Sequence, residues 1–138
     1  MEYVKTVLTK YADFSGRADK SEFWYWVLFN IIIAIGINII FGIFSAITDS
    51  PTILMVGTIL LIIWSLGILV PNLAVAVRRL HDTNRSGAWY FIAFVPLVGV
   101  IALLVFWVQD SYPGPNQWGP EPGTEETHNA MNQIIDYK

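Results

Sequence analysis

Three long runs without a charged side chain constrain this chain more than any other feature. Residues 23–48, 50–77 and 86–109 contain no Asp, Glu, Lys or Arg. A helix of about 20 mostly apolar residues crosses a hydrocarbon core about 30 Å thick, and each run exceeds that length. Lipid offers no partner for backbone N–H and C=O groups, whereas a helix satisfies them within its own segment. The runs therefore predict an all-α, polytopic transmembrane protein with three spans.

The composition agrees with a chain built largely for lipid. Charged residues make up 14% of it, whereas about 25% is usual in soluble domains. We expect an N-terminal interfacial segment (1–22), a transmembrane helical domain (23–109) and a polar, flexible C-terminal tail (110–138), without a separate soluble catalytic module. The first run is about twice as long as the apolar core of a signal peptide, which favours a retained helix. Apolar residues at helical spacing predict an amphipathic helix over residues 2–12, lying in the membrane interface.

Turn and breaker residues predict how the runs connect. The short stretch from Thr48 to Pro51 predicts a tight antiparallel hairpin, and Ser21 can cap the helix before it. Pro71 predicts a kink near the end of the second span. Pro96 interrupts the third run midway, so the alternative is that this run is split in two, giving four membrane segments. After residue 110 the chain is rich in Pro, Gly, Asn and Glu, which predicts an extended or disordered tail, with a short helical turn near Met131.

The positions of the basic residues predict the orientation. Seven of the eight Lys and Arg precede the first run or lie in the loop 78–87, and the last is Lys138. Because cytoplasmic flanks carry the excess of Lys and Arg, we expect the N-terminus and this loop in the cytoplasm. Three spans would put the tail on the opposite side, and a split third run would return it to the cytoplasmic side.

Small and polar residues recur along one face of each of the first two spans. On the first span they are spaced by four and on the second by seven, a pattern typical of helices that approach closely in membranes. We interpret them as helix-packing residues, although a polar substrate path would use the same positions: Ala34, Asn38, Gly42 and Ala46, and Thr58, Ser65 and Asn72. No Asp, Glu, Lys, Arg or His lies inside the spans, which disfavours an ion-coupled transporter.

The loop after the second span concentrates the groups that carry chemistry. Arginines there can hold the oxygens of a phosphate with paired donors, so we interpret this region as a candidate site for lipid or anion binding. The candidates are Arg78, Arg79, His81, Asp82, Arg85 and Ser86, with Arg17 from the N-terminal segment. The plainer alternative is that these residues only anchor the topology and touch acidic lipid heads.

Catalytic and metal-binding residues are not assigned. His81 beside Asp82 does not form a catalytic dyad, because consecutive helical side chains point about 100° apart. The chain has two histidines, His81 and His128, far apart in sequence, whereas a metal site needs clustered ligands. No cofactor is expected.

Three ordered motifs carry a resemblance to a known family. They are Phe14-Ser15-Gly16-Arg17 followed by Glu22-Phe23-Trp24, then Pro71 to Asp82 with Arg85-Ser86-Gly87, and finally Gly114 to Pro122. Together they resemble the DUF805 family of small bacterial inner-membrane proteins, over about residues 11–122, with Arg78-Arg79-Leu80-His81-Asp82 as the most specific part. The family has no assigned function. The resemblance therefore implies the fold and the location, and no reaction or cofactor.

We expect a non-enzymatic structural, regulatory or anionic-lipid-interacting component of the bacterial inner membrane. Its expected partners are membrane lipids, anionic headgroups among them, and a second copy or another membrane protein, with no role for nucleic acid. One alternative is a membrane enzyme that acts on a phosphate-bearing lipid, using His81, Asp82, Thr83 or Ser86. The other is a small oligomeric transporter or channel subunit, whose pore the polar line of the second span would face.

Overall fold

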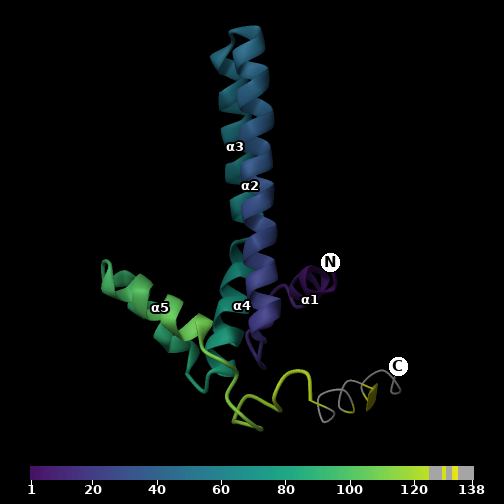
Figure 1. Cartoon of the computed structure of the whole chain (residues 1–138), viewed down its shortest axis with the longest axis vertical. Helices are drawn as coiled ribbons and strands as arrows, with labels where there is room; N and C mark the ends of the chain where they lie inside the picture. The colour runs from purple at the N-terminus through teal and green to yellow at the C-terminus, as the bar shows by residue number, and fades with distance from the viewer. Residues whose placement is uncertain (125–128, 130–131, 134–138) are drawn as a thin grey trace.

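A computed structural model describes residues 1–124, 129, 132 and 133, and the described part of the chain is helical, without a named strand (Figure 1). Two long helices stand side by side as a hairpin, and the shorter elements gather at one end, which we call the base. The helices are α1 (Glu2–Thr9), α2 (Lys20–Thr48), α3 (Pro51–Gly67), α4 (Leu69–Asp82), the 3-10 helix η1 (Gly87–Phe94) and α5 (Val98–Val108). The expected turn near Met131 lies outside the described residues, and the expected segment boundaries stay a prediction.

The hairpin of α2 and α3 forms where the sequence predicts it. Asp19 caps α2 by accepting a hydrogen bond from the backbone N–H of Glu22, so the expectation that Ser21 is the cap is wrong. The helix ends at Thr48, Asp49 adopts a left-handed conformation (φ 49°), and Pro51 begins α3. The 29 residues of α2 extend about 43 Å at about 1.5 Å each, which is enough to cross a bilayer.

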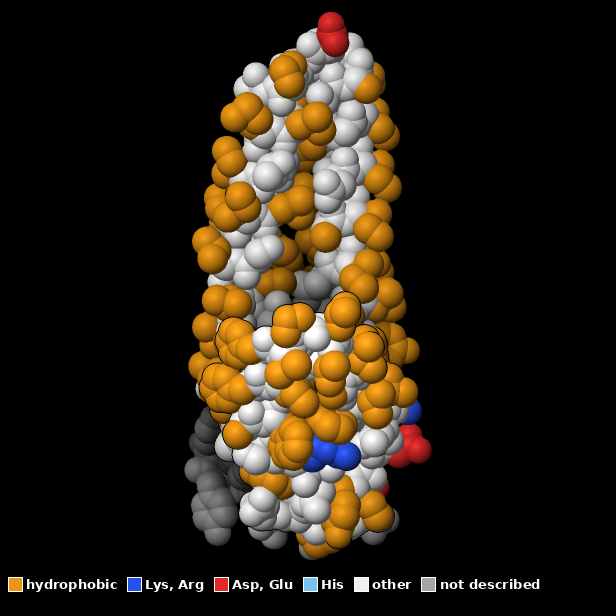
Figure 2. Space-filling model, turned by 90° about the vertical axis from the view of Figure 1, so that its left-hand side faces the viewer, with side chains coloured by type: hydrophobic (Ala, Val, Ile, Leu, Met, Phe, Trp, Pro, Cys, Tyr) orange, Lys and Arg blue, Asp and Glu red, His pale blue; other side chains and the backbone are white. Residues whose placement is uncertain are grey.

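The surface of the hairpin is apolar and unburied. None of the most apolar stretch of α2 is buried within the chain, and hydrophobic side chains cover the hairpin in Figure 2. The two helices touch where Gly57 faces Phe41, because a Cβ built on Gly57 would lie 2.8 Å from the Phe41 Cβ. A continuous apolar surface of this size is what lipid, rather than water, covers.

The second run bends sharply, as Pro71 predicts. The axes of α3 and α4 differ by 47°, and the break falls at Ile68, just before the proline. Pro71 has no N–H to donate to the carbonyl of Gly67, one helical turn earlier. The hydroxyl of Tyr11 donates to that carbonyl instead. The predicted kink is therefore confirmed, and a side chain from the N-terminal segment satisfies the freed carbonyl.

The third run is broken, and three spans are not confirmed. It consists of η1, with 8 residues, and α5, with 11, joined by a turn in which Leu97 has φ 62°. The two pieces pack closely, since a Cβ on Gly99 would lie 1.7 Å from the carbonyl oxygen of Ile92. Neither piece is long enough to cross a bilayer by itself. Within the described residues, α2 and the bent pair α3–α4 are the helices with the length and composition of spans.

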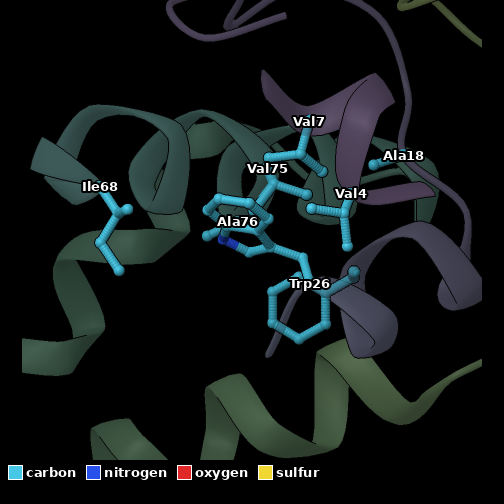
Figure 3. Close-up of a cluster of buried hydrophobic side chains, with 8 residues drawn as sticks. Val4, Val7, Ala18, Trp26, Ile68, Val75 and Ala76 are labelled. Atoms are coloured by element: carbon cyan, nitrogen blue, oxygen red, sulfur yellow. The ribbon is translucent and has the colours of Figure 1, made fainter. Parts of the chain in front are cut away.

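The buried core lies at the base. Val4 and Val7 of α1 point toward Trp26 of α2 and Val75 of α4 (Figure 3), and Tyr3 stacks on Tyr25 with ring centroids 5.3 Å apart. The predicted N-terminal amphipathic helix therefore exists, although it ends at Thr9, and its apolar face packs against protein. Its place in the membrane interface stays a prediction.

Candidate functional site

A buried network of charged side chains joins distant parts of the chain at the base. It consists of three arginines and two carboxylates from the N-terminal segment, α2 and α4: Arg17, Glu22, Arg78, Arg79 and Asp82. Helix α4 supplies three of the five, and a backbone hydrogen bond of 3.1 Å from Ala18 to Arg78 holds the N-terminal segment beside it. Burial of charge is costly unless each group is paired, so the pairing decides what this region can do.

Asp82 is the centre of the network. Its side chain is 0% exposed, and its Oδ1 accepts from Arg17 Nε at 3.0 Å. Its Oδ2 accepts from Arg79 Nη1 and from the hydroxyl of Ser111, the latter at 2.6 Å. Both carboxylate oxygens are thus occupied by internal donors, two of them charged, which gives the stronger class of hydrogen bond.

Arg17 binds the beginning of the C-terminal tail. Its Nη1 and Nη2 each donate at 2.7 Å, to the backbone carbonyls of Gly114 and Tyr112, and Nη1 also reaches the carbonyl of Gly119 at 3.3 Å. The tail segment 111–119 has no regular secondary structure of its own beyond an isolated bridge between Asn116 and Gly119. The lack of helix expected for the tail is therefore observed in this segment. The Arg17 guanidinium nevertheless holds the segment in place, because three of its backbone carbonyls accept from that one group.

Arg79 caps the end of α5. Besides Asp82, it donates from Nε to the carbonyl of Trp107 at 3.1 Å and from Nη2 to the carbonyl of Gln109. The last carbonyls of a helix have no partner within the helix and carry partial negative charge, which a cation stabilises. Arg79 thereby fixes the returning arm of the third run to α4.

Arg78 and Glu22 form a second buried pair. Arg78 Nη1 lies 2.5 Å from a carboxylate oxygen of Glu22, and the Arg78 side chain is 0% exposed. Its Nε and Nη2 are buried without a hydrogen-bond partner among the described residues. Its charge also reaches Asp13: burial acts to raise the pKa of Asp13, but hydrogen bonds from Ser15 and the charge of Arg78 outweigh it and the pKa is lowered.

His81 is covered by the tail. Its Nδ1 lies 3.0 Å from the carbonyl of Gly16, so it is the nitrogen that carries the proton in this contact. The ring stacks on Trp118, with centroids 4.6 Å apart and planes 6° apart. Asn116 donates to the His81 carbonyl at 2.9 Å. The tail therefore covers the imidazole, and its contacts with the ring and the carbonyl of His81 hold the tail at the base.

Arg85 and Ser86 stand apart from the network. The Arg85 guanidinium lies over the ring of Phe106, 4.1 Å from its centroid, and donates to Gln109 Oε1 at 2.8 Å. Ser86 caps η1 by accepting from the N–H of Ala88 at 3.3 Å. Of the seven predicted lipid- or anion-binding residues, the structure joins Arg17, Arg79 and Asp82 directly. Arg78 and His81 lie beside them on α4, and His81 also contacts Trp118 of the tail.

The predicted helix-packing residues are only partly brought together. Ala34, Ser65 and Asn72 line one cavity beside the base. Asn38, Ala46 and Thr58 are exposed, and a Cβ on Gly42 would meet nothing within 4 Å. The role predicted for these four residues, packing of the first two spans against each other, stays a prediction.

Sequence reasoning missed three partners of the predicted site residues: Glu22 pairs with Arg78, Ser111 donates to Asp82, and Trp118 stacks on His81. Glu22, Ser111 and Trp118 were not predicted as site residues, although Glu22 and Trp118 lie in motifs that carry the family resemblance. One available signal was charge balance, since three arginines that leave water together need more than the single carboxylate of Asp82. Within the described residues no three His, Cys, Asp or Glu side chains gather as a metal site would require.

A lipid-exposed helix hairpin on a base of buried ion pairs defines a helical integral membrane protein. The sequence matches the family described as "Protein of unknown function (DUF805)" over residues 11–120, so the chain belongs to this family, as its motifs predict. The five charged residues of the network all lie within the matched range.

Two relatives from Escherichia coli K12 match nearly their whole length. The inner membrane protein YhaI is 39% identical over 122 residues, covering 88% of this chain and 96% of the relative. The inner membrane protein YhaH is 34% identical over 125 residues, covering 91% and 99%. Their names support the bacterial inner membrane as the location. No solved structure matches the chain.

Proposed function

We propose that this protein is a non-enzymatic structural component of the bacterial inner membrane, and that its Arg78 to Asp82 segment works as an internal clamp. We define the clamp as the buried ion pairs of Arg17, Arg78 and Arg79 with Glu22 and Asp82, together with the tail segment 111–119. The observation that carries the proposal is the saturation of Asp82, whose two oxygens accept from Arg17, Arg79 and Ser111. A cradle for an external phosphate would instead leave arginine donors free of internal carboxylates.

The candidate catalytic groups of the loop also have internal partners. His81 donates to Gly16 and is covered by Trp118. The Thr83 hydroxyl donates to the carbonyl of Leu80 at 3.0 Å, and Ser86 caps η1. An enzyme needs a nucleophile or a base within reach of its substrate. These contacts favour a structural role over the alternative of a lipid-phosphate enzyme.

Anionic lipid, in this proposal, binds to the cations outside the clamp. Lys5 is exposed, the Lys20 side chain is 45% exposed, and Arg85 lies over Phe106 at the protein surface. Cations placed at the headgroup level attract anionic lipids without a shaped site. The clamp would hold these three cations at one depth in the membrane, so the structural role would also position the residues that contact lipid.

A pair of variants tests this division. Replacing Arg17, Arg78 and Arg79 by Lys keeps every charge but removes the planar fork of donors. We expect a lower melting temperature in mild detergent and unchanged retention of phosphatidylglycerol by native mass spectrometry. Replacing Lys5, Lys20 and Arg85 by Gln should leave the melting temperature unchanged and lower the retention of phosphatidylglycerol. Loss of retained lipid in the first variant, with its melting temperature unchanged, would sink the clamp and favour a phosphate site.

We further propose two membrane passes, α2 and α3–α4, with η1 and α5 as a hairpin that returns the tail to the side of the N-terminus. The contacts of Arg17 with Gly114 and Tyr112 support this arrangement. Since seven of the eight Lys and Arg precede the first run or lie in the loop 78–87, the positive-inside rule favours the cytoplasm for this side.

Cysteine labelling tests the topology, because the chain has no native Cys. In spheroplasts, an impermeant maleimide should label Ser50→Cys at the tip of the hairpin, and should reach Asn84→Cys and Thr124→Cys only after permeabilisation. Labelling of Thr124→Cys from outside, with Asn84→Cys protected, would instead show that the third run crosses the membrane.

A further inference from the structure

The third run folds back as a short hairpin that projects from the base. We call η1, α5 and the turn between them the arm (residues 87–108). The arm leaves the base beside α4 and rises on the same side as the two long helices, diverging from them (Figure 1). Its root is tied to the base, where Arg79 donates to the carbonyl of Gln109 and Arg85 donates to its side chain. The arm is therefore fixed at its root, and its tip projects away from the base.

The arm is apolar on every face. No charged residue and no His, Asn, Gln, Ser or Thr lies between Gly87 and Val108. Hydrophobic side chains cover the arm in Figure 2, and the side chains of Phe94 and Leu97 at its tip are 81% and 79% exposed. A helix that lies in the membrane interface keeps a polar face toward water. A helix that is apolar all round belongs in a protein core or in the membrane interior, and here the protein does not cover it.

The backbone of the tip is also suited to hydrocarbon, where an N–H group without a partner is costly. The amide of Val95 donates to the carbonyl of Ile92, and the amide of Gly99 donates to the carbonyl of Val95, both at 2.9 Å. The amide of Val98 donates to the carbonyl of Pro96 at 2.7 Å, and Pro96 has no N–H. The turn therefore pairs these amides internally and needs no water for them.

The length of the arm matches one leaflet. The 11 residues of α5 and the 8 residues of η1 each extend about 16 Å, at about 1.5 Å and about 2 Å per residue. One leaflet contributes about half of a hydrocarbon core about 30 Å thick. Even if it stood upright, the arm would therefore end near the midplane, within the leaflet on the side of the base, which we call the base-side leaflet.

The two leaflets consequently meet different cross-sections of the protein. Of the described helices, only α2 and α3 continue into the far leaflet, whereas η1 and α5 stand beside the hairpin in the base-side leaflet. A helix about 10 Å wide occupies roughly 80 Å², so the arm adds roughly 160 Å² to one leaflet. A bilayer that is convex on the base side has more area in that leaflet and accommodates this shape with less strain. Shallow insertion of apolar helices is sensitive to curvature for the same reason.

We propose that the arm inserts into the base-side leaflet alone, and that the protein therefore prefers membrane that is convex on its base side. The partner is a lipid surface that is selected by its curvature. This inference rests on the proposed two-pass topology, because only in that topology do both ends of the arm lie on one side of the bilayer.

Fluorescence quenching measures the depth of the arm in vesicles of equal parts dioleoylphosphatidylcholine and dioleoylphosphatidylglycerol. The fluorophore NBD is attached to Phe94→Cys at the tip or to Ala88→Cys at the root, and spin-labelled lipids quench it from a shallow or a deep position of the acyl chain. We expect the deep spin label to quench the tip more strongly and the shallow one to quench the root more strongly.

The depth measurement separates failure of the inserted arm from failure of the topology. Shallow quenching at both positions, with Thr124→Cys still labelled only after permeabilisation, would overturn the inserted arm and leave the two-pass topology intact. Deep quenching at the tip, with Thr124→Cys labelled from outside, would show that the third run crosses the membrane and would overturn both.

Membrane tubes pulled from giant vesicles of the same lipids test the preference for curvature, because the outer surface of a tube is convex. Dithionite does not cross the membrane and bleaches NBD on the outside. With NBD on Ser50→Cys, at the tip of the hairpin, it leaves fluorescent the copies whose base faces out. With NBD on Thr124→Cys it leaves the copies whose base faces in. The base-out copies should be about twofold enriched in the tube relative to the vesicle, and the base-in copies depleted. Equal densities of the two orientations in the tube would overturn the preference.

Matched variants connect the sorting to the arm. Phe94→Asp places a charge at the tip, which is costly near the midplane, so the tip should move to the headgroups and the sorting should be lost. Ile47→Asp is the control, because Ile47 is 75% exposed but lies at the far end of α2, near the headgroups of the other leaflet. Undiminished sorting in Phe94→Asp would contradict the proposal. If this variant does not fold, the comparison of the two orientations of the unmodified arm still decides it.

Discussion

Neutralising Asp82 should destabilise the protein more than any other single change of charge. Asp82→Asn keeps the size of the side chain but leaves Arg17 and Arg79 buried without their common carboxylate. Removing one partner of a buried ion pair typically costs about 3–5 kcal/mol. For a chain of this length that corresponds to a melting temperature lower by about 10–17 °C, by scaling from globular domains. Thermal denaturation in mild detergent measures the shift.

Asp110→Asn is the matched control. Asp110 also pairs with a cation, Lys20, at 3.1 Å, but its side chain is 95% exposed. Exposed pairs contribute at most about 1 kcal/mol, so this variant should melt close to the wild type.

Chymotrypsin adds a readout for the tail. If the clamp holds residues 111–119, cleavage after Trp118 should be faster in Asp82→Asn than in Asp110→Asn. Equal melting temperatures and equal cleavage of the two variants would refute the clamp.

Two further predictions concern the hairpin and the bend. Gly57→Ala should lower the melting temperature, because its Cβ would lie 2.8 Å from the Phe41 side chain, whereas Gly42→Ala should be tolerated by the isolated chain; the opposite ranking would show that the two helices pack through another face. Tyr11→Phe should cost about 1 kcal/mol by removing the donor to the Gly67 carbonyl. Hydrogen exchange at Ile68 should be faster in that variant, and unchanged exchange would mean that the hydroxyl does not support the bend.

The helices and their interruptions were largely predictable from the sequence. The absence of charge over residues 23–48 predicts α2, and Pro71 predicts the bend because a proline cannot donate to the preceding turn. The break of the third run was predicted only as an alternative. A continuous apolar helix and two short packed pieces have the same composition. The close approach of Gly99 to Ile92 is a tertiary contact that the periodicity of the sequence does not reveal.

The clamp was not predictable in its pairings. The loop arginines were identified as the chemically distinctive region, and Arg79 pairs with Asp82 only three positions away. The other pairings are distant in sequence: Arg78 and Glu22 are 56 residues apart, and Arg17 and Asp82 are 65 apart. Helical periodicity relates residues three or four positions apart and carries no information at such separations. The face of α2 that meets α3 was missed for a related reason, because regular spacing of small residues does not show which helix they meet.

The clamp joins the first part of the chain to the last, and this sets an order of events during synthesis. Arg17 cannot reach the carbonyls of Tyr112 and Gly114 until the ribosome has made the tail, after both long helices. Until then the Arg17 guanidinium lacks these two partners and is available as one of the basic residues that favour a single side of the bilayer. Once the tail is made, Arg17 is withdrawn from water, and its hydrogen bonds to the tail complete the fold.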